Sequence, residues 1–185
     1  MNSLLIDTHS DYIYIAIYQN EKLSYEKKIE DEKEHSRITI PTLVEVLTES
    51  KLTLPEIDDI VVINGPGSFT GVRIGVTIAK TLAFTLNKPI RTMTSLELYL
   101  TNEAENKYLV LPEKNGYYVG KVENGQINDY EYIKKDEYAT WKDNKELYLC
   151  EQVDTTNLMI RAHQKPTVNP HYVNPFYVKK IEALK

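Results

Sequence analysis

The stretch Ile60-Val-Val-Ile-Asn64-Gly65-Pro66-Gly67-Ser68-Phe69-Thr70-Gly71-Val72-Arg73-Ile74-Gly75 decides the fold of this chain. Its apolar run over 60–63 is typical of a parallel strand that is covered on both faces. A glycine–proline turn interrupts the run, and the hydroxyl side chains after the turn can cap a helix by accepting a backbone N–H. That helix is predicted to end near Leu86, and a second strand is predicted at Ile90. The sequence therefore predicts a βαβ unit over residues 60–90.

Glycine is concentrated in this unit, since four of the seven glycines of the chain lie between Gly65 and Gly75. A glycine inside a helix costs roughly 0.5–1 kcal/mol relative to alanine, so the backbone there is expected to pass close to another group. Gly71 and Gly75 are four residues apart and share one face of the predicted helix, where a second helix could approach closely. Two interpretations stay open, which are packing within the chain and contact with a partner protein.

Apolar residues form two stripes along this helix, which is predicted over 68–86. Two stripes indicate a helix that is buried over most of its circumference. Asn87 follows at the left-handed position, and Pro89 prevents continuation. The first stripe contains Val72, Val76, Ala79, Ala83 and Leu86, and the second contains Ile74, Ile78 and Leu82.

The turn before the helix has a second interpretation, which is anion binding. Free N–H groups and the helix dipole attract phosphate at a helix N-terminus, and no acidic residue occurs over 60–96. Gly65, Gly67 and Ser68 would then contact the anion. The glycine spacing matches neither common phosphate-binding fingerprint, so a tight turn with no ligand stays open as well.

The run Gly65-Pro66-Gly67-Ser68-Phe69-Thr70-Gly71-Val72-Arg73-Ile74-Gly75, with Ala79-Lys80 after it, resembles the signature of the TsaB (YeaZ) family. That family belongs to the bacterial machinery that makes threonylcarbamoyladenosine in tRNA. The resemblance is strong over residues 1–100, and Asn174-Pro175-Phe176-Tyr177-Val178-Lys179 is similar to the Pro-x-Tyr-Leu-Arg close of many members. It implies the α/β fold of actin-like and sugar-kinase-like ATPases (ASKHA), with a smaller, shortened second domain.

The first strands precede this unit. Residues 3–8, 12–18 and 23–29 are predicted as a β-meander that opens an α/β domain. Asp7 and Thr8 end the first strand, where ATPases of the implied fold hold phosphate and metal. Those ATPases usually carry glycine two residues after the aspartate, whereas His9 stands here. A turn that satisfies its own backbone is the alternative.

A second helix is predicted over 36–50, since Ile40, Leu43, Val44 and Leu47 follow helical spacing. The resemblance implies that this helix and the one after the glycine turn form the surface that pairs with the catalytic relative TsaD. His35 could suggest catalysis, but no second histidine stands nearby, so a capping or interface role is favoured. The implied partner-binding residues are His35, Ser36, Ile40, Leu43, Val44, Leu47, Phe69, Thr70, Gly71, Val72, Arg73, Gly75, Val76 and Ala79.

We place a domain boundary in the polar segment 101–107, which gives an N-terminal domain over 1–102 and a smaller C-terminal domain with a basic tail over 103–185. Strands are predicted at 108–111, 117–122, 127–133 and 147–150, and Asn124-Gly125 indicates a hairpin. A short helix is predicted over 136–142. The tail over 161–185 carries five Lys or Arg and one acid, so it could touch tRNA phosphates or dock on the protein.

Composition narrows the function classes. Net charge is −5, so the chain shows no overall footprint of a free-standing nucleic-acid binder. Cys150 is the only cysteine, and neither His-x-x-x-His nor His-Glu-x-x-His occurs. No basic and apolar leader precedes Leu4, and no apolar run approaches ~18 residues. We therefore expect a cytoplasmic protein that does not interact with a membrane.

The resemblance implies a non-catalytic subunit of the complex that transfers threonylcarbamoyl to N6 of the adenosine next to the tRNA anticodon. A TsaD-like subunit would carry the chemistry, a TsaE-like ATPase would join, and tRNA would be bound through the complex. A homodimer through the same helices stays open. No catalytic residue, metal or cofactor is expected in this chain, and ATP or ADP could lie at the complex interface. The alternatives are a small ATP-dependent kinase that uses Asp7, Thr8 and the 65–71 turn, and a metallopeptidase-like protein.

Overall fold

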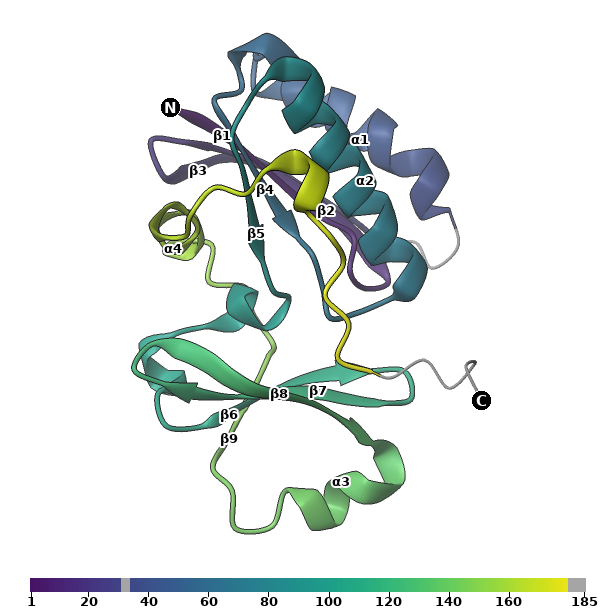
Figure 1. Ribbon diagram of the computed structural model, residues 1–185, viewed down its shortest axis with the longest axis vertical. Coiled ribbons are helices and arrows are strands. Elements are labelled where there is room, and N and C mark those ends of the chain that lie inside the picture. The colour runs from purple at the N-terminus through teal and green to yellow at the C-terminus, as the bar shows by residue number, and fades with distance from the viewer. Residues whose placement is uncertain (31–33, 180–185) are drawn as a thin grey trace.

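The computed structural model describes residues 1–30 and 34–179 of the chain. Its first sheet has the strand order β3-β2-β1-β4-β5 (Figure 1). The predicted meander is confirmed, because β1 (Asn2–Asp7), β2 (Tyr12–Gln19) and β3 (Lys22–Glu30) pair antiparallel in succession. The predicted βαβ unit is also confirmed, since β4 (Asp59–Ile63) pairs parallel to both β1 and β5 (Ile90–Met93).

Two helices cover one face of this sheet and lie side by side, namely α1 (His35–Glu49) and α2 (Phe69–Leu86) (Figure 1). Ser68 caps α2, because its Oγ accepts from the backbone N–H of Gly71 at 3.3 Å. Asn87 ends α2 in the left-handed conformation, with φ of 52°. The predicted bounds of both helices and both ends of α2 are therefore confirmed.

The prediction that α2 is buried over most of its circumference is wrong. The first stripe is buried as far as Ala83, but Ile74, Ile78 and Leu82 are only half-buried. By length and composition alone α2 could cross a membrane, with a mean hydropathy of 1.2 over 18 residues. The core helix of a folded domain passes the same test, so this is weak evidence for a membrane span. It nevertheless corrects the expectation that no apolar run approaches 18 residues. A third of this apolar helix is buried.

The second sheet has the order β8-β7-β6-β9. Its strands are β6 (Tyr108–Glu113), β7 (Gly116–Glu123), β8 (Gln126–Lys134) and β9 (Leu147–Leu149), and α3 (Lys135–Trp141) follows β8. The predicted hairpin is confirmed, because β7 and β8 are antiparallel around Asn124-Gly125. Short 3₁₀ helices lie at Leu54–Glu56, Leu96–Tyr99 and Asn102–Ala104. A core of buried side chains from both sheets, including Leu5, Val61, Leu109 and Val122, joins the two parts.

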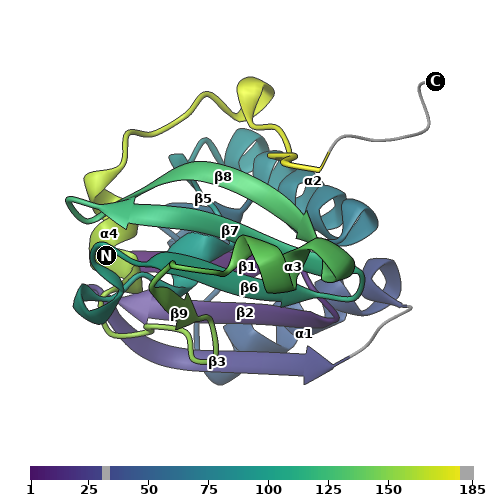
Figure 2. The same ribbon diagram turned by 90° about the horizontal axis from the view of Figure 1, so that it is seen from below.

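After β9 the chain returns to the first sheet through α4 (Leu158–Gln164) and a 3₁₀ helix at Pro170–Tyr172. We call residues 165–179 the strap. Val168 forms a β-bridge with Ile90, and the strap then runs along α2, on the side away from α1 (Figures 1 and 2). Our assignment of all of 103–185 to the second domain is therefore corrected for the strap, and residues 180–185 lie outside the described residues.

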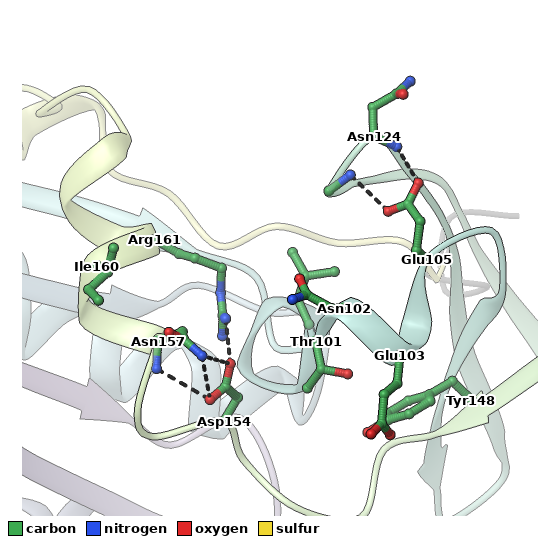
Figure 3. A pocket seen from close by; sticks show the side chains of 12 residues that line it. Thr101, Asn102, Glu103, Glu105, Asn124, Tyr148, Asp154, Asn157, Ile160 and Arg161 are labelled. Atoms are coloured by element: carbon green, nitrogen blue, oxygen red, sulfur yellow. Dashed lines mark hydrogen bonds and ion pairs between the residues drawn. The ribbon is translucent and has the colours of Figure 1, made fainter.

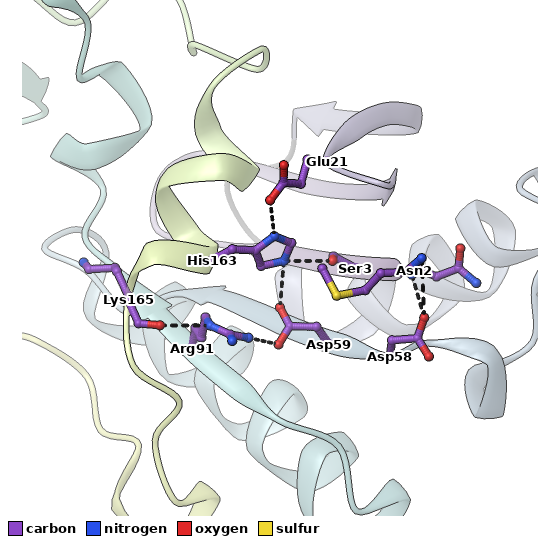
Figure 4. Close-up of polar contacts among 9 residues, drawn as sticks. Asn2, Ser3, Glu21, Asp58, Asp59, Arg91, His163 and Lys165 are labelled. Atoms are coloured by element: carbon purple, nitrogen blue, oxygen red, sulfur yellow. Dashed lines mark hydrogen bonds and ion pairs between the residues drawn. The ribbon is translucent and has the colours of Figure 1, made fainter.

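A polar cluster fixes α4 to the edge of the first sheet (Figure 4). His163 Nδ1 lies 2.9 Å from Glu21 Oε1, and its Nε2 lies 3.4 Å from Asp59 Oδ2. Arg91 pairs with Asp59 and donates through Nε to the carbonyl of Lys165 at 3.0 Å. Burial raises the pKa of Asp59, although the charges of Arg91 and His163 oppose this rise. The strap therefore begins from an anchored point.

Candidate functional site

The inner face of α2 packs on the end of β1. Thr8 Oγ1 donates to the carbonyl of Gly71 at 2.6 Å and accepts from the N–H of Gly75 at 3.1 Å. A methyl group at Gly71 would overlap the backbone oxygen of Thr8, and one at Gly75 would overlap its hydroxyl. The close approach that the glycines permit is thus within the chain. The prediction that Gly71 and Gly75 contact a partner is wrong, because both face the sheet.

The residues predicted to hold a nucleotide or anion do come together, but they use their polar groups on one another. Asp7 is fully buried, and its Oδ1 accepts from the backbone N–H of His9 at 3.0 Å and lies 2.7 Å from His9 Nδ1. Ser68 N–H donates to the carbonyl of His9 at 2.6 Å, and Gly67 packs against that same carbonyl. His9 therefore occupies the polar groups of Asp7 and Ser68 that an anion or its metal would contact.

Gly65 completes this turn with a φ of 109°, and a side chain there would approach the carbonyl of Phe176 to 2.6 Å. Asp7 Oδ2 is buried and has no partner among the described residues. The other oxygen, Oδ1, is already engaged by His9. These residues do not fit a nucleotide, and the structure favours the turn that satisfies its own backbone.

His35 begins α1, is buried, and its Nε2 lies 2.9 Å from the carbonyl of Ser10. A cavity of about 90 Å³ opens between the N-terminal ends of α1 and α2, lined in part by His35, Ser68 and Ile74. Sites for small molecules usually measure about 300–1,000 Å³, so this cavity is small for a nucleotide. His35 links α1 to the β1–β2 turn, and its predicted interface role is corrected because the chain buries it.

Ser3, His163 and Glu21 follow one another as the side chains of a serine hydrolase triad do. Ser3 Oγ lies 3.2 Å from His163 Nε2, and His163 Nδ1 lies 2.9 Å from Glu21. A nucleophile must reach a substrate, yet Ser3, at the start of β1, is only 1% exposed. Within residues 1–30 and 34–179, no group of three or more His, Cys, Asp and Glu could hold a metal ion. This cluster is therefore structural.

The outer surface of α1 and α2 carries apolar side chains that the rest of the chain does not fully cover. Ile40 is 46% exposed and Val44 is 57% exposed on α1, while Ile74, Ile78 and Leu82 are half-buried on the flank of α2. We call these five residues the helix ridge. Ser36, Phe69, Thr70 and Arg73 are also exposed, as a partner-binding role requires.

The remaining predicted partner-binding residues are buried within the chain. Helical periodicity places them on the faces that meet the sheet, so they cannot reach a partner without unfolding. The prediction is therefore wrong for Leu43, Leu47, Val72, Val76 and Ala79, which all belong to the core of the first domain.

A cavity of about 970 Å³ lies on another side, between the second sheet and α4 (Figure 3). Three of its charged side chains are engaged within the chain. Asp154 pairs with Arg161 at 2.6 Å, and Glu105 accepts from the N–H groups of Asn124 and Gly125. Burial opposes the charge of Asp154, but hydrogen bonds from Arg161 and Asn157 lower its pKa overall. Its residues come from separate segments with no shared motif, so sequence reasoning missed it.

Comparison with known proteins identifies relatives of this chain. A sequence profile of the family "TsaD: tRNA N6-adenosine threonylcarbamoyltransferase" matches residues 27–114. The TsaB protein of Bacillus subtilis, named for tRNA threonylcarbamoyladenosine biosynthesis, is 38% identical over 112 residues, which cover 60% of this chain and 49% of that protein. The chain thus spans about half the length of this relative.

Solved structures show the same fold. YeaZ from Pseudomonas aeruginosa matches with a TM-score of 0.75 and 17% identity, covering 95% of this chain and 100% of the other. The activator of 2-hydroxyisocaproyl-CoA dehydratase from Clostridium difficile, solved with ADPNP, matches with a TM-score of 0.51 and 14% identity, covering 73% of this chain and 46% of the other. These likenesses agree with the predicted actin-like and sugar-kinase-like ATPase fold.

Three findings therefore agree on the family. The run from Gly65 to Gly75 resembles the signature, 112 residues of the chain are similar to TsaB, and 95% of the chain matches the fold of YeaZ. By sequence over part of its length and by fold over nearly all of it, the chain is similar to the TsaB (YeaZ) proteins.

Proposed function

We propose that this chain is the non-catalytic subunit of the complex that transfers threonylcarbamoyl to N6 of the adenosine next to the tRNA anticodon. Its task is to hold a TsaD-like catalytic subunit in the active arrangement. The observation that carries this proposal is the helix ridge. The names of the relatives supply the pathway, and the ridge supplies a surface for the task.

The helix ridge has the properties of an interface. Surface helices normally turn polar side chains outward, but α2 has a mean hydropathy of 1.2 and only a third of it is buried. Val44 and Ile40 are exposed on α1, which lies beside α2 (Figure 1). Contiguous exposed apolar patches mark sites of protein–protein contact. Two adjacent helices that present such a patch fit a helical surface on the partner.

The other parts of the complex follow from the same proposal. A TsaE-like ATPase would join the assembly, and tRNA would be bound through the complex. A second copy of this chain could cover the ridge when the TsaD-like subunit is absent. ATP or ADP would bind at the interface between subunits, because Asp7, His9 and Ser68 close the turn within this chain.

The experiment compares two charge insertions in the full chain. Val44→Asp puts a carboxylate on the ridge, and Leu149→Asp puts one at an equally exposed apolar position on β9. Both are surface changes, so both variants should fold with stability changes of about 0.5 kcal/mol or less. We expect Val44→Asp to lose binding to the TsaD-like subunit of the same organism, and Leu149→Asp to retain it, as measured by calorimetry.

A cellular experiment tests the pathway itself. Depletion of this protein should abolish threonylcarbamoyladenosine in total tRNA, as measured by nucleoside mass spectrometry. The Leu149→Asp chain should restore the nucleoside and the Val44→Asp chain should not. An unchanged nucleoside level after depletion would refute the proposed function. Normal binding by Val44→Asp would refute the role of the ridge.

A further inference from the structure

A second surface lies on the other flank of α2, where the strap packs. Arg73 occupies the first turns of α2, and its guanidinium carbon lies 3.8 Å from the centroid of the Phe69 ring. Its Nε donates to the hydroxyl of Tyr177 at 2.9 Å. Phe69 and Tyr177 themselves stack, with ring centroids 5.4 Å apart. Helix and strap together therefore hold one guanidinium in a fixed position.

The two terminal nitrogens of Arg73 are left for another molecule. Among the described residues, none forms a hydrogen bond or ion pair with Nη1 or Nη2, and Arg73 is exposed. A guanidinium presents its donors in a planar fork that matches a carboxylate with two parallel hydrogen bonds. Because stacking and the Tyr177 contact already restrict this side chain, binding would cost little further conformational entropy.

The charges around Arg73 favour an acidic group. Neither segment that builds this surface contains Asp or Glu, over 60–96 in the βαβ unit and over 155–179 in α4 and the strap. The chain as a whole carries a net charge of −5, so this surface differs in sign from the rest. A carboxylate that a partner places here would meet no acidic side chain from these two segments.

Aromatic side chains extend the surface along α2. Phe69 is 44% exposed, Tyr177 41%, Phe84 63% and Tyr172 75%. Phe69 and Phe84 are fifteen residues apart, which corresponds to about 22 Å of helix. We call these four residues and Arg73 the strap face. Exposed aromatics around an arginine are the composition of energetic hot spots in protein interfaces.

We propose that Arg73 is an anchor of the partner interface and binds a carboxylate side chain of the partner protein, with the aromatic residues of the strap face around it. This inference rests on the proposed function and extends the interface from the helix ridge across α2 to the strap. A nucleic-acid partner fits less well, because backbone binding requires several free cations. Lys80, the nearest lysine of α2, already donates to the carbonyls of Val173 at 3.0 Å and His171 at 3.4 Å.

The test measures the affinity of the full chain for the TsaD-like subunit of the same organism by calorimetry at low and moderate salt. Arg73→Glu should weaken binding by about 30-fold or more, as hot-spot arginines do. Arg73→Lys should weaken it by about tenfold, since a lysine loses the paired contact. Tyr177→Phe should weaken it only a few-fold, because the ring stack stays while the Nε contact is lost.

Lys114→Glu is the matched control. It makes the same change of charge at an exposed turn of the second sheet and should bind like the wild type. Rescue of Arg73→Glu by an acid-to-arginine change on the partner would identify the carboxylate and confirm the inference. Wild-type affinity in Arg73→Glu would overturn it, as would a loss confined to tRNA binding. Absence of binding by the wild-type chain would instead refute the proposed function on which the inference rests.

Discussion

The two faces of α2 differ in their residue types and in what they contact. The inner face is made of Gly71 and Gly75, which let the helix backbone meet Thr8 of β1. The outer face carries Arg73 and Phe84, which are large, exposed and leave polar and apolar groups uncovered. The family signature spans both faces within eleven residues. The difference shows that its glycines allow α2 to pack closely on β1. Its larger residues are the ones exposed on the surface.

The largest effect should come from filling the inner face. Gly71→Ala should destabilise the protein by about 3 kcal/mol, because the new methyl overlaps a backbone oxygen that cannot move away alone. Alanine has a better helix propensity by about 1 kcal/mol, so the clash must exceed that gain. Urea denaturation measures the loss, and Thr81→Ala on the exposed face is the control. Equal stability of Gly71→Ala and wild type would break the comparison.

The second prediction removes the polar partner of the glycines. Thr8→Val keeps the shape of the side chain but loses both hydrogen bonds of Oγ1 to α2. A lost buried hydrogen bond costs about 1–2 kcal/mol, and the free energy of unfolding should fall by that amount. Thr8→Ser retains the hydroxyl and should lose less. If the two variants are equally unstable, packing rather than hydrogen bonding attaches the inner face.

The third prediction concerns the start of the helix. Ser68→Ala removes the cap on Gly71 N–H and should cost about 1 kcal/mol, measured by the thermal midpoint. Ser68→Asn supplies another capping oxygen and should retain most of the stability. Since the N–H of Ser68 already donates to His9 and is not free for an anion, added phosphate should not change the thermal midpoint. A phosphate-dependent rise would restore the anion-binding interpretation.

The fourth prediction uses pH to test how α4 is held through the pair of Asp154 and Arg161. The pKa of Asp154 is lowered below its ordinary value of 3.8. A group with a lowered folded-state pKa stabilises the protein above its unfolded-state pKa, and this stability is lost as pH falls through the folded-state value. The advantage of wild type over Asp154→Asn should therefore stay constant above about pH 4 and shrink as the pH falls further. A difference that stays constant below that pH as well would contradict a role for the charge.

The smallest effect on stability should come from the outer face. Thr77 is exposed and lies two residues after Gly75. Thr77→Lys should change the free energy of unfolding by no more than about 0.5 kcal/mol, because the new side chain extends into solvent. The same change should weaken binding of the TsaD-like subunit, since it puts a hydrated charge between the helix ridge and the strap face. A large loss of stability would show that this face also packs within the chain.

Sequence reasoning predicted most elements of the first domain but only part of the site. The helix after the glycine turn, its caps and the Asn124-Gly125 hairpin follow from local rules, and each is present. Periodicity also grouped Gly71 with Gly75 correctly. It could not say whether that group meets the sheet or a partner, and the choice of a partner was wrong. Of the strap face, Phe69 and Arg73 were predicted, whereas Phe84, Tyr172 and Tyr177 were missed, although the absence of acids from 60–96 and from 155–179 was a visible signal.

The sequence by itself determined the elements of this protein, because helix caps, turns and apolar periodicity act between residues that are close along the chain. The tertiary structure alone decided what each surface meets. His9 closes the turn that could have held an anion, and Tyr177 reaches Arg73 across more than a hundred residues. Such contacts depend on how the elements pack in space. That packing buries the inner face of α2 against the sheet and leaves the outer face exposed.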